Sequence, residues 1–217
     1  MNSLMWIYNK LLEYYGEPTW WPADTPYEVI VGSILTQNTA WNNVEKVIQN
    51  MKENLSPSYI LDISQQDLKE IIRPAGFAER KSSCLKAVTE WYRTYNFNVS
   101  TIQKEPMEKI RSELLSIKGV GPETADAILL YAFDFTTFVI DAYTARLCNR
   151  FPIAVGKGYS DMKSFFERSI KRDIDVYSNY HALIVIHSKT HCKKTPLCNG
   201  CVLAAKCKKR IEIVTYT

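Results

Sequence analysis

The sequence predicts an all-α protein, and two observations carry that prediction. Apolar residues recur three and four positions apart along most of the 217 residues, which is the spacing of one helix face. Residues that start or end helices, such as Gly16, Thr25-Pro26 and Ser56-Pro57, stand between these segments. The sequence has no convincing series of strands, no internal repeat and no low-complexity tract.

Each helix is expected where an apolar stripe lies between such signals. The first stripe ends at Gly16-Glu17-Pro18. Thr25 and Pro26 provide a cap and a first-turn proline for the second helix, which is apolar enough to be central. The expected helices are 1–15, 27–36, 41–54, 57–62, 65–72, 78–95, 106–115, 122–133, 141–150, 160–172 and 175–188. Residues 73–77 are expected to form a turn, and 96–105 and 151–159 to form loops.

Composition indicates a packed globule, large enough for one large or two small domains. Hydrophobic residues make up 46% and charged residues 23%. No apolar run approaches the roughly 18–20 residues that span a bilayer. The N-terminal segment lacks the apolar core of a signal peptide. We therefore expect an intracellular protein with no membrane partner, cytoplasmic and, if prokaryotic, nucleoid-associated.

Positive charge is concentrated near the C-terminal end. Residues 189–210 contain seven of the 27 Lys and Arg residues and no acid, which leaves 20 basic and 23 acidic residues elsewhere. Such a patch suits a polyanion. A solvated basic tail explains the charge equally well.

Four of the six cysteines are close together, at Cys192, Cys198, Cys201 and Cys207. In a cytosolic chain this density points to a metal. Zinc sites usually offer two separated close pairs, whereas here one C-x2-C is flanked by a single Cys on each side. Four thiolates suit a [4Fe-4S] cluster, with zinc as the less favoured alternative and free thiols as the third. We expect a cluster here to be a structural staple rather than a redox catalyst.

A glycine turn, Lys118-Gly119-Val120-Gly121, joins two predicted helices, and Asp141 precedes a third. Glycine permits positive φ and close backbone approach. Free N–H groups at the start of the next helix can bind a phosphate without reading sequence, although many such turns are plain connections. On local grounds Asp141 is a helix cap.

Four segments together resemble motifs of the endonuclease III superfamily of DNA glycosylases, over nearly the whole chain. Leu115-x-x-Lys118-Gly119-Val120-Gly121-x-x-Thr124-Ala125 is similar to its helix–hairpin–helix, and Val139-Ile140-Asp141 to its catalytic Asp segment. The cysteine loop is similar to its iron–sulfur motif, with one residue fewer between the first two cysteines. Leu35-Thr36-Gln37-Asn38-Thr39 is similar to the segment whose Gln fills the gap left by an extruded base. The resemblance implies DNA contacts at Gln37, Lys118, Gly119, Val120, Gly121 and Thr124.

The resemblance also gives Asp141 a catalytic role that is compatible with capping. A carboxylate can stabilise the oxocarbenium character of the sugar and orient or deprotonate the attacking water. Bifunctional members carry, two residues after the second hairpin glycine, a Lys that forms a Schiff base with the sugar. Here that position is Glu123, and Lys118 is a poor substitute. We therefore expect base removal without AP-lyase strand cleavage.

Further segments are similar to the 3-methyladenine glycosylases of the superfamily: Trp20-Trp21-Pro22, Arg73-Pro74-x-Gly76-Phe77 and Ala125-Asp126-Ala127-Ile128-Leu129. This resemblance places Trp20, Trp21, Pro22, Trp41 and Lys189 in a base pocket. Indole walls suit a cationic alkylated purine, through a cation–π gain of roughly 0.5–2 kcal/mol. Core packing under a loop is the other explanation of the tryptophan corner. The best-known form of this branch lacks the iron–sulfur cysteines, which this chain has.

The resemblance implies two helical domains with the active-site cleft between them. Residues 23–133 would form a six-helix barrel with the hairpin, and 1–22 with 134–217 would carry Asp141 and the cysteine loop. The expected function is excision of 3-methyladenine, or a related alkylated purine, from double-stranded DNA by a monomer in base excision repair. The alternatives are a glycosylase for oxidised pyrimidines or mismatched bases, and a non-catalytic structure-specific DNA-binding protein.

Overall fold

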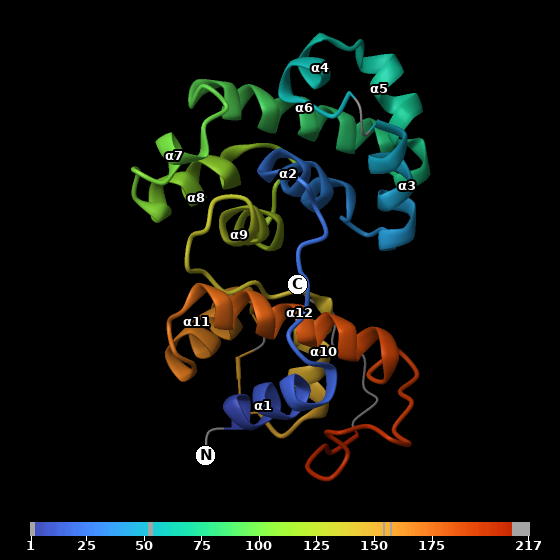
Figure 1. Cartoon of the computed structure of the whole chain (residues 1–217), viewed down its shortest axis with the longest axis vertical. Helices are drawn as coiled ribbons and strands as arrows, with labels where there is room; N and C mark the ends of the chain where they lie inside the picture. The colour runs from blue at the N-terminus through green and yellow to red at the C-terminus, as the bar shows by residue number, and fades with distance from the viewer. Residues whose placement is uncertain (1–2, 52–53, 154, 157, 210–217) are drawn as a thin grey trace. The chain divides into compact units, whose positions relative to one another are not determined.

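The computed structural model describes residues 3–51, 54–153, 155–156 and 158–209, and within these ranges its regular structure is entirely helical (Figure 1). The all-α prediction is confirmed. The helices are α1 (Ser3–Tyr15), α2 (Pro26–Leu35), α3 (Trp41–Met51), α4 (Pro57–Asp62), α5 (Gln65–Ile72), the 3-10 helix η1 (Arg73–Ala75), α6 (Ala78–Thr94), α7 (Val99–Ile102), α8 (Met107–Ser116), α9 (Pro122–Tyr131), α10 (Ala142–Arg150), α11 (Tyr159–Ser169) and α12 (Ile174–Thr190). Arg210, the last residue of the basic segment, lies outside the described residues.

The chain divides into two compact units. One unit, Ala23–Phe135, is called here the hairpin unit, and the other, Met1–Pro22 with Thr136–Thr217, the aspartate unit. The sequence-based expectation placed the second division after residue 133. Each unit has its own apolar core.

Helix α2 is the centre of the hairpin unit, where it packs against α3, α6 and α9 (Figure 1). Every residue from Tyr27 to Leu35 is buried except Glu28. The helix begins at Thr25, whose Oγ1 accepts a hydrogen bond of 3.1 Å from the Glu28 backbone N–H. The expected cap and the expected central position are thus both observed.

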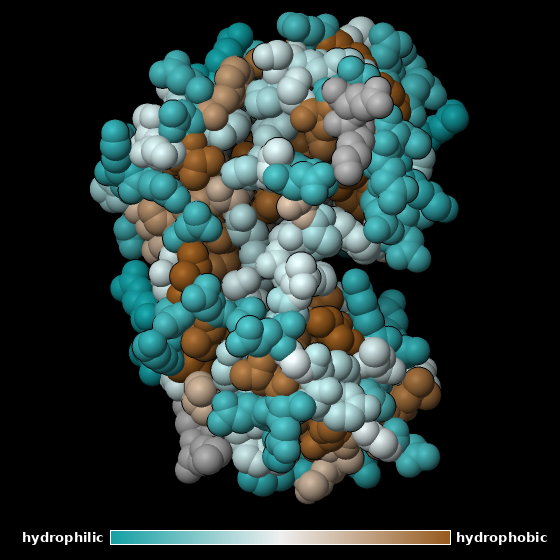
Figure 2. Space-filling view, in the orientation of Figure 1, coloured by the Kyte–Doolittle hydropathy of each residue, from teal (hydrophilic) through white to brown (hydrophobic). Residues whose placement is uncertain are grey.

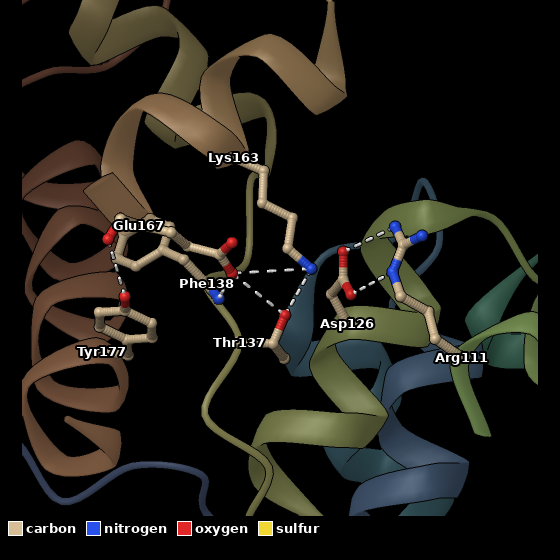
Figure 3. Close-up of polar contacts among 7 residues, drawn as sticks. All are labelled: Arg111, Asp126, Thr137, Phe138, Lys163, Glu167 and Tyr177. Atoms are coloured by element: carbon tan, nitrogen blue, oxygen red, sulfur yellow. Dashed lines mark hydrogen bonds and ion pairs between the residues drawn. The ribbon is translucent and has the colours of Figure 1, made fainter. Parts of the chain in front are cut away.

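An ion pair joins the two helices that flank the glycine turn. Arg111 of α8 donates through Nε and Nη2 to the two carboxylate oxygens of Asp126 of α9, at 2.8 and 3.1 Å (Figure 3). Asp126 is fully buried and Arg111 is partly exposed. A two-bond contact of this kind fixes the relative orientation of both groups. The pair therefore holds α8 and α9 in the arrangement that supports the turn.

The aspartate unit is built on α12, against which α1 and α10 pack. Buried aromatic side chains fill its core, and the Phe138 and Phe166 rings are stacked with centroids 4.4 Å apart. The buried Tyr180 hydroxyl donates to the Leu4 backbone carbonyl at 2.8 Å, which ties α1 to α12. This core supports the start of α10, where Asp141 lies.

The structure differs from the expected elements at several helix ends and in one loop: α9 ends at Tyr131, α11 at Ser169 and α12 at Thr190, where 133, 172 and 188 were expected. Residues 96–105, expected to form a loop, contain the single-turn helix α7. The Asn98 side chain caps α7 by accepting a hydrogen bond from the Thr101 backbone N–H at 3.1 Å.

The two glycines of the hairpin turn differ in backbone conformation, because Gly121 has φ −97°, whereas Gly119 has φ +100°. Only one of the two hairpin glycines therefore uses the left-handed freedom of glycine.

Hydrophilic side chains cover most of the face drawn in Figure 2, and hydrophobic residues are exposed there singly or in small groups. Among the described helices, none combines the length and the apolar character that crossing a membrane would require.

Candidate active site

The glycine turn is packed directly against α6. A Cβ atom added to Gly119 would lie 3.1 Å from Cys84 Cβ and 3.2 Å from Cys84 Sγ, and the φ of +100° is itself unfavourable for other residues. Helix α9 begins immediately after Gly121, with Pro122 in its first turn. The first-turn N–H groups of a helix have no acceptor within the helix. The turn therefore has the geometry of an anion-binding helix start.

Gln37 is joined to this turn. Its Nε2 donates to the Gly119 carbonyl at 2.9 Å and contacts Thr124 Oγ1 at 3.0 Å. The structure thus brings together three residues that were expected to contact DNA. The Lys118 side chain is exposed. The side chains of Val120 and Thr124 are buried and pack on the protein side of the turn.

Asp141 caps α10 and is buried. Its Oδ1 accepts a hydrogen bond of 2.7 Å from the Thr144 backbone N–H, and its Oδ2 lies 3.4 Å from His181 Nε2 of α12. Burial raises the pKa of Asp141, but His181 and Thr144 more than offset this effect and hold the pKa below its ordinary value. Asp141 is therefore an ionised carboxylate at neutral pH.

The segment that leads into Asp141 is held by α11. The Phe138 backbone N–H donates to Glu167 Oε1 at 2.9 Å, and Lys163 Nζ donates to Thr137 Oγ1 (Figure 3). The Glu167 backbone carbonyl in turn accepts a hydrogen bond from the Tyr177 hydroxyl at 3.4 Å. These contacts hold Phe138 by its backbone and Thr137 by its side chain, three and four residues before Asp141.

The tryptophan corner lies in the same unit as Asp141. The Trp20 and Trp21 rings meet edge to face with centroids 5.8 Å apart, and Lys189 Nζ lies 5.8 Å from the centroid of the Trp20 ring. Burial lowers the pKa of Lys189, and the negative charge of Asp141 opposes that shift. Lys189 therefore lies near the Trp20 ring and close enough to Asp141 to be influenced by its charge. Trp41 begins α3 in the hairpin unit, and Pro22 is exposed at the end of the corner.

The cysteine loop follows α12. The buried Arg150 guanidinium donates to Cys192 Sγ at 3.3 Å and to the Lys193 carbonyl at 2.6 Å. Burial raises the pKa of Cys201, and the other three cysteines of the loop raise it further, so all four thiols are electrostatic neighbours. Within the described part of the chain, no three His, Cys, Asp or Glu side chains are arranged as metal ligands.

Two side chains of interest were not singled out from the sequence, and a third, Phe77, was named there only as part of a similar segment. His181 and Lys81 are buried polar residues on helices, and only their partners in space reveal them. Phe77 is 63% exposed and has φ +50° directly before α6. The signal in the sequence was an aromatic residue placed directly after Gly76 in a predicted turn.

The helix–hairpin–helix, the buried aspartate that caps α10 and the all-helical architecture are together those of a DNA glycosylase of base excision repair. The model of the HhH-GPD superfamily of base excision DNA repair proteins matches residues 31–172. The chain belongs to this superfamily.

Three known proteins are similar to the chain over most of its length. A candidate DNA repair glycosylase of Methanocaldococcus jannaschii is 47% identical over 206 residues, which cover 93% of this chain and 94% of that protein. The H. pylori 3-methyladenine DNA glycosylase, solved with bound 1,N6-ethenoadenine, is 26% identical with a TM-score of 0.75, and the match covers 87% of this chain and 98% of that chain. A non-covalent endonuclease III–DNA complex, 19% identical, has a TM-score of 0.80 over 96% of this chain and 97% of that chain. The last similarity establishes the shared fold.

Proposed function

We propose that this protein is a monofunctional DNA glycosylase that extrudes a damaged base and removes it by hydrolysis. The observation that carries the proposal is the buried Asp141 carboxylate, held 2.7 Å from the Thr144 backbone N–H and 3.4 Å from His181 Nε2. As the base leaves, positive charge develops on the sugar, and a fixed carboxylate stabilises it. The same carboxylate can orient the water that attacks C1′.

The residue that replaces the family's Schiff-base lysine supports a hydrolytic rather than a lyase mechanism. Glu123 is exposed in the first turn of α9, two residues after Gly121. A carboxylate cannot form an imine with the sugar, because imine formation requires an amine. Base removal should therefore leave an intact strand with an abasic site.

An alkylated purine, such as 3-methyladenine, is the proposed substrate. An extruded base must be recognised in a pocket. The Trp20 ring already has a cation beside it, because Lys189 Nζ lies 5.8 Å from the ring centroid. An indole with this property suits a purine made cationic by alkylation. The similarity to the H. pylori enzyme favours the same substrate class.

The four cysteines support a proposed [4Fe-4S] cluster, with zinc as the less favoured alternative. Cys192, Cys198, Cys201 and Cys207 provide the four sulfur ligands that such a cluster takes. Two of these sulfur atoms already have donors, because Arg150 donates to Cys192 Sγ and the Lys209 backbone N–H donates to Cys207 Sγ at 3.4 Å. Such donors stabilise ligated thiolates. A bound cluster would hold the basic loop in one conformation. Iron analysis and visible absorbance would distinguish an iron–sulfur cluster from zinc.

The excision assay uses duplexes that each contain one lesion: 3-methyladenine, 1,N6-ethenoadenine, an oxidised pyrimidine or a mismatched thymine. Release of the alkylated purines supports the proposal. Release of the pyrimidines alone would support the second candidate, an endonuclease III-like glycosylase. That candidate is favoured by the four cysteines, which the best-known form of the 3-methyladenine branch lacks. Lesion-dependent binding without release of any base would indicate a non-catalytic DNA-binding protein.

A further inference from the structure

Two turns of the hairpin unit, residues 36–39 and 75–77, are held together by hydrogen bonds, and each has one exposed residue, Asn38 in the first and Phe77 in the second. The first carries Gln37 and the second carries Phe77, which is 63% exposed. Thr39 Oγ1 donates to the Ala75 carbonyl at 2.5 Å and so joins the two turns directly. We call these two turns together the double turn.

A buried lysine occupies the junction. Lys81 of α6 is only 1% exposed. Its Nζ donates to the Leu35 carbonyl at 2.7 Å, to Thr39 Oγ1 at 2.7 Å and to the Ala75 carbonyl at 2.8 Å. An ammonium has three N–H donors, and here each has an acceptor: one before the first turn, one at its end and one at the start of the second.

The ammonium also lies near the exposed aromatic residue. Lys81 Nζ is 5.9 Å from the centroid of the Phe77 ring, and the Lys81 backbone N–H donates to the Phe77 carbonyl at 3.0 Å. Both the backbone and the side chain of Lys81 therefore bear on the position of Phe77. Gln37, on the other turn, is bound to Gly119 of the hairpin.

We infer that Lys81 is a positioning residue for base extrusion, because it sets the double turn as one rigid wedge that enters the DNA stack beside the extruded nucleotide. This inference rests on the proposed function. An apolar ring inserted between bases unstacks them and stabilises the distorted duplex. Such a wedge must keep its conformation when it is inserted between the bases. The three hydrogen bonds of the Lys81 ammonium restrain both turns and so keep the wedge rigid.

The charge state of Lys81 gives the wedge a dependence on pH. Burial, with a smaller contribution from the neighbouring Arg80, lowers the pKa of Lys81 to about 8. The three groups that accept hydrogen bonds from Nζ, on α2, the first turn and η1, are uncharged. Above this pH the neutral amine has two N–H donors for three acceptors, so the double turn loses one of its ties.

The test uses a duplex with a stable abasic-site analogue flanked by 2-aminopurine, whose fluorescence rises when it unstacks. This readout needs no base release, so it is independent of the substrate. At saturating protein, Lys81→Met should lower the fluorescence enhancement, and it should slow single-turnover release of whichever base the wild-type protein removes by about tenfold or more. For wild-type protein the enhancement should fall as pH rises through about 8, whereas for the variant it should stay flat.

The matched control is Lys86→Met. Lys86 lies on the same helix and donates to the carbonyls of Leu61 and Ile63, at the end of α4 and away from the double turn. It should lower thermal stability in a similar way and leave the enhancement unchanged. If both variants lower the enhancement equally, or Lys81→Met leaves it unchanged, the inference is overturned.

Thr39→Ala keeps the test decisive should Lys81→Met fail to fold. It removes one acceptor of Lys81 and the direct tie to Ala75, and it should reduce the enhancement by about threefold. If wild-type protein enhances the 2-aminopurine fluorescence but releases no base from any duplex, the proposed function is overturned and the inference about the wedge stands. Base release by wild-type protein together with unchanged enhancement in Thr39→Ala and Lys81→Met would overturn the wedge and leave the proposed function intact.

Discussion

His181 Nε2 lies 3.4 Å from Asp141 Oδ2, and both side chains are buried. Burial alone would raise the pKa of Asp141, and His181 is the largest opposing influence. Replacing His181 with Phe should therefore raise the pKa of Asp141 and move the acidic limb of the pH–rate profile to higher pH. The loss of rate relative to wild-type protein should therefore be largest at acidic pH, where the variant's Asp141 takes up a proton first.

The measurement for His181 is kcat/KM as a function of pH for wild-type protein and the variant. His181→Gln, which retains a side-chain donor, is the conservative comparison and should shift the limb less. An unchanged pH profile in His181→Phe, with reduced rates throughout, would show that His181 acts only through packing.

Asp141→Asn should abolish base release, by a factor of about a thousand or more, while DNA binding persists. Asn is a good helix cap, so α10 should remain intact. Asp173→Asn is the matched control, because Asp173 also caps a helix of the same unit, by accepting from the backbone N–H groups of Asp175 and Val176. Base release that survives Asp141→Asn would exclude Asp141 as the catalytic carboxylate.

Phe77→Ala should weaken binding to an abasic-site duplex by about tenfold or more, because a base–aromatic stack contributes about 1–3 kcal/mol. The thermal midpoint should hardly change, since the side chain is 63% exposed. Leu197→Ala, at another exposed apolar residue, is the control for loss of surface hydrophobicity. Equal effects of the two substitutions on binding would argue against a specific role for Phe77.

Arg111→Met should destabilise the protein by roughly 3 kcal/mol, because it leaves the fully buried Asp126 carboxylate without its bidentate partner. The double substitution Arg111→Met with Asp126→Leu should recover part of this loss, since it also removes the buried Asp126 carboxylate. Urea unfolding of the two variants measures the difference. A double variant less stable than Arg111→Met would contradict this account of the ion pair.

The sequence allowed the helices to be predicted closely, because caps and periodicity are local signals. Thr25 and Asp141 cap the helices that follow them, as expected. Helix α7 was missed because a single turn is too short to show periodicity. The hairpin was recognisable for a similar reason, since Gly119 has a backbone conformation that disfavours other residues.

The long-range pairings of the site could not be predicted. Lys81 looks like an ordinary surface lysine in sequence, and its acceptors lie on segments elsewhere in the chain. His181 lies in an apolar stretch of α12, and nothing local indicates that its partner is Asp141. Such contacts depend on how helices pack, which periodicity alone does not determine.

The central claim, hydrolytic excision of an alkylated purine without strand cleavage, is tested most directly on one duplex containing 3-methyladenine. The released base and the strand are analysed together, with borohydride present in a parallel sample. We predict free 3-methyladenine, an uncut strand and no trapped covalent complex, because Glu123 cannot form an imine. Absence of the free base, or strand cleavage with a borohydride-trapped complex, would contradict this account.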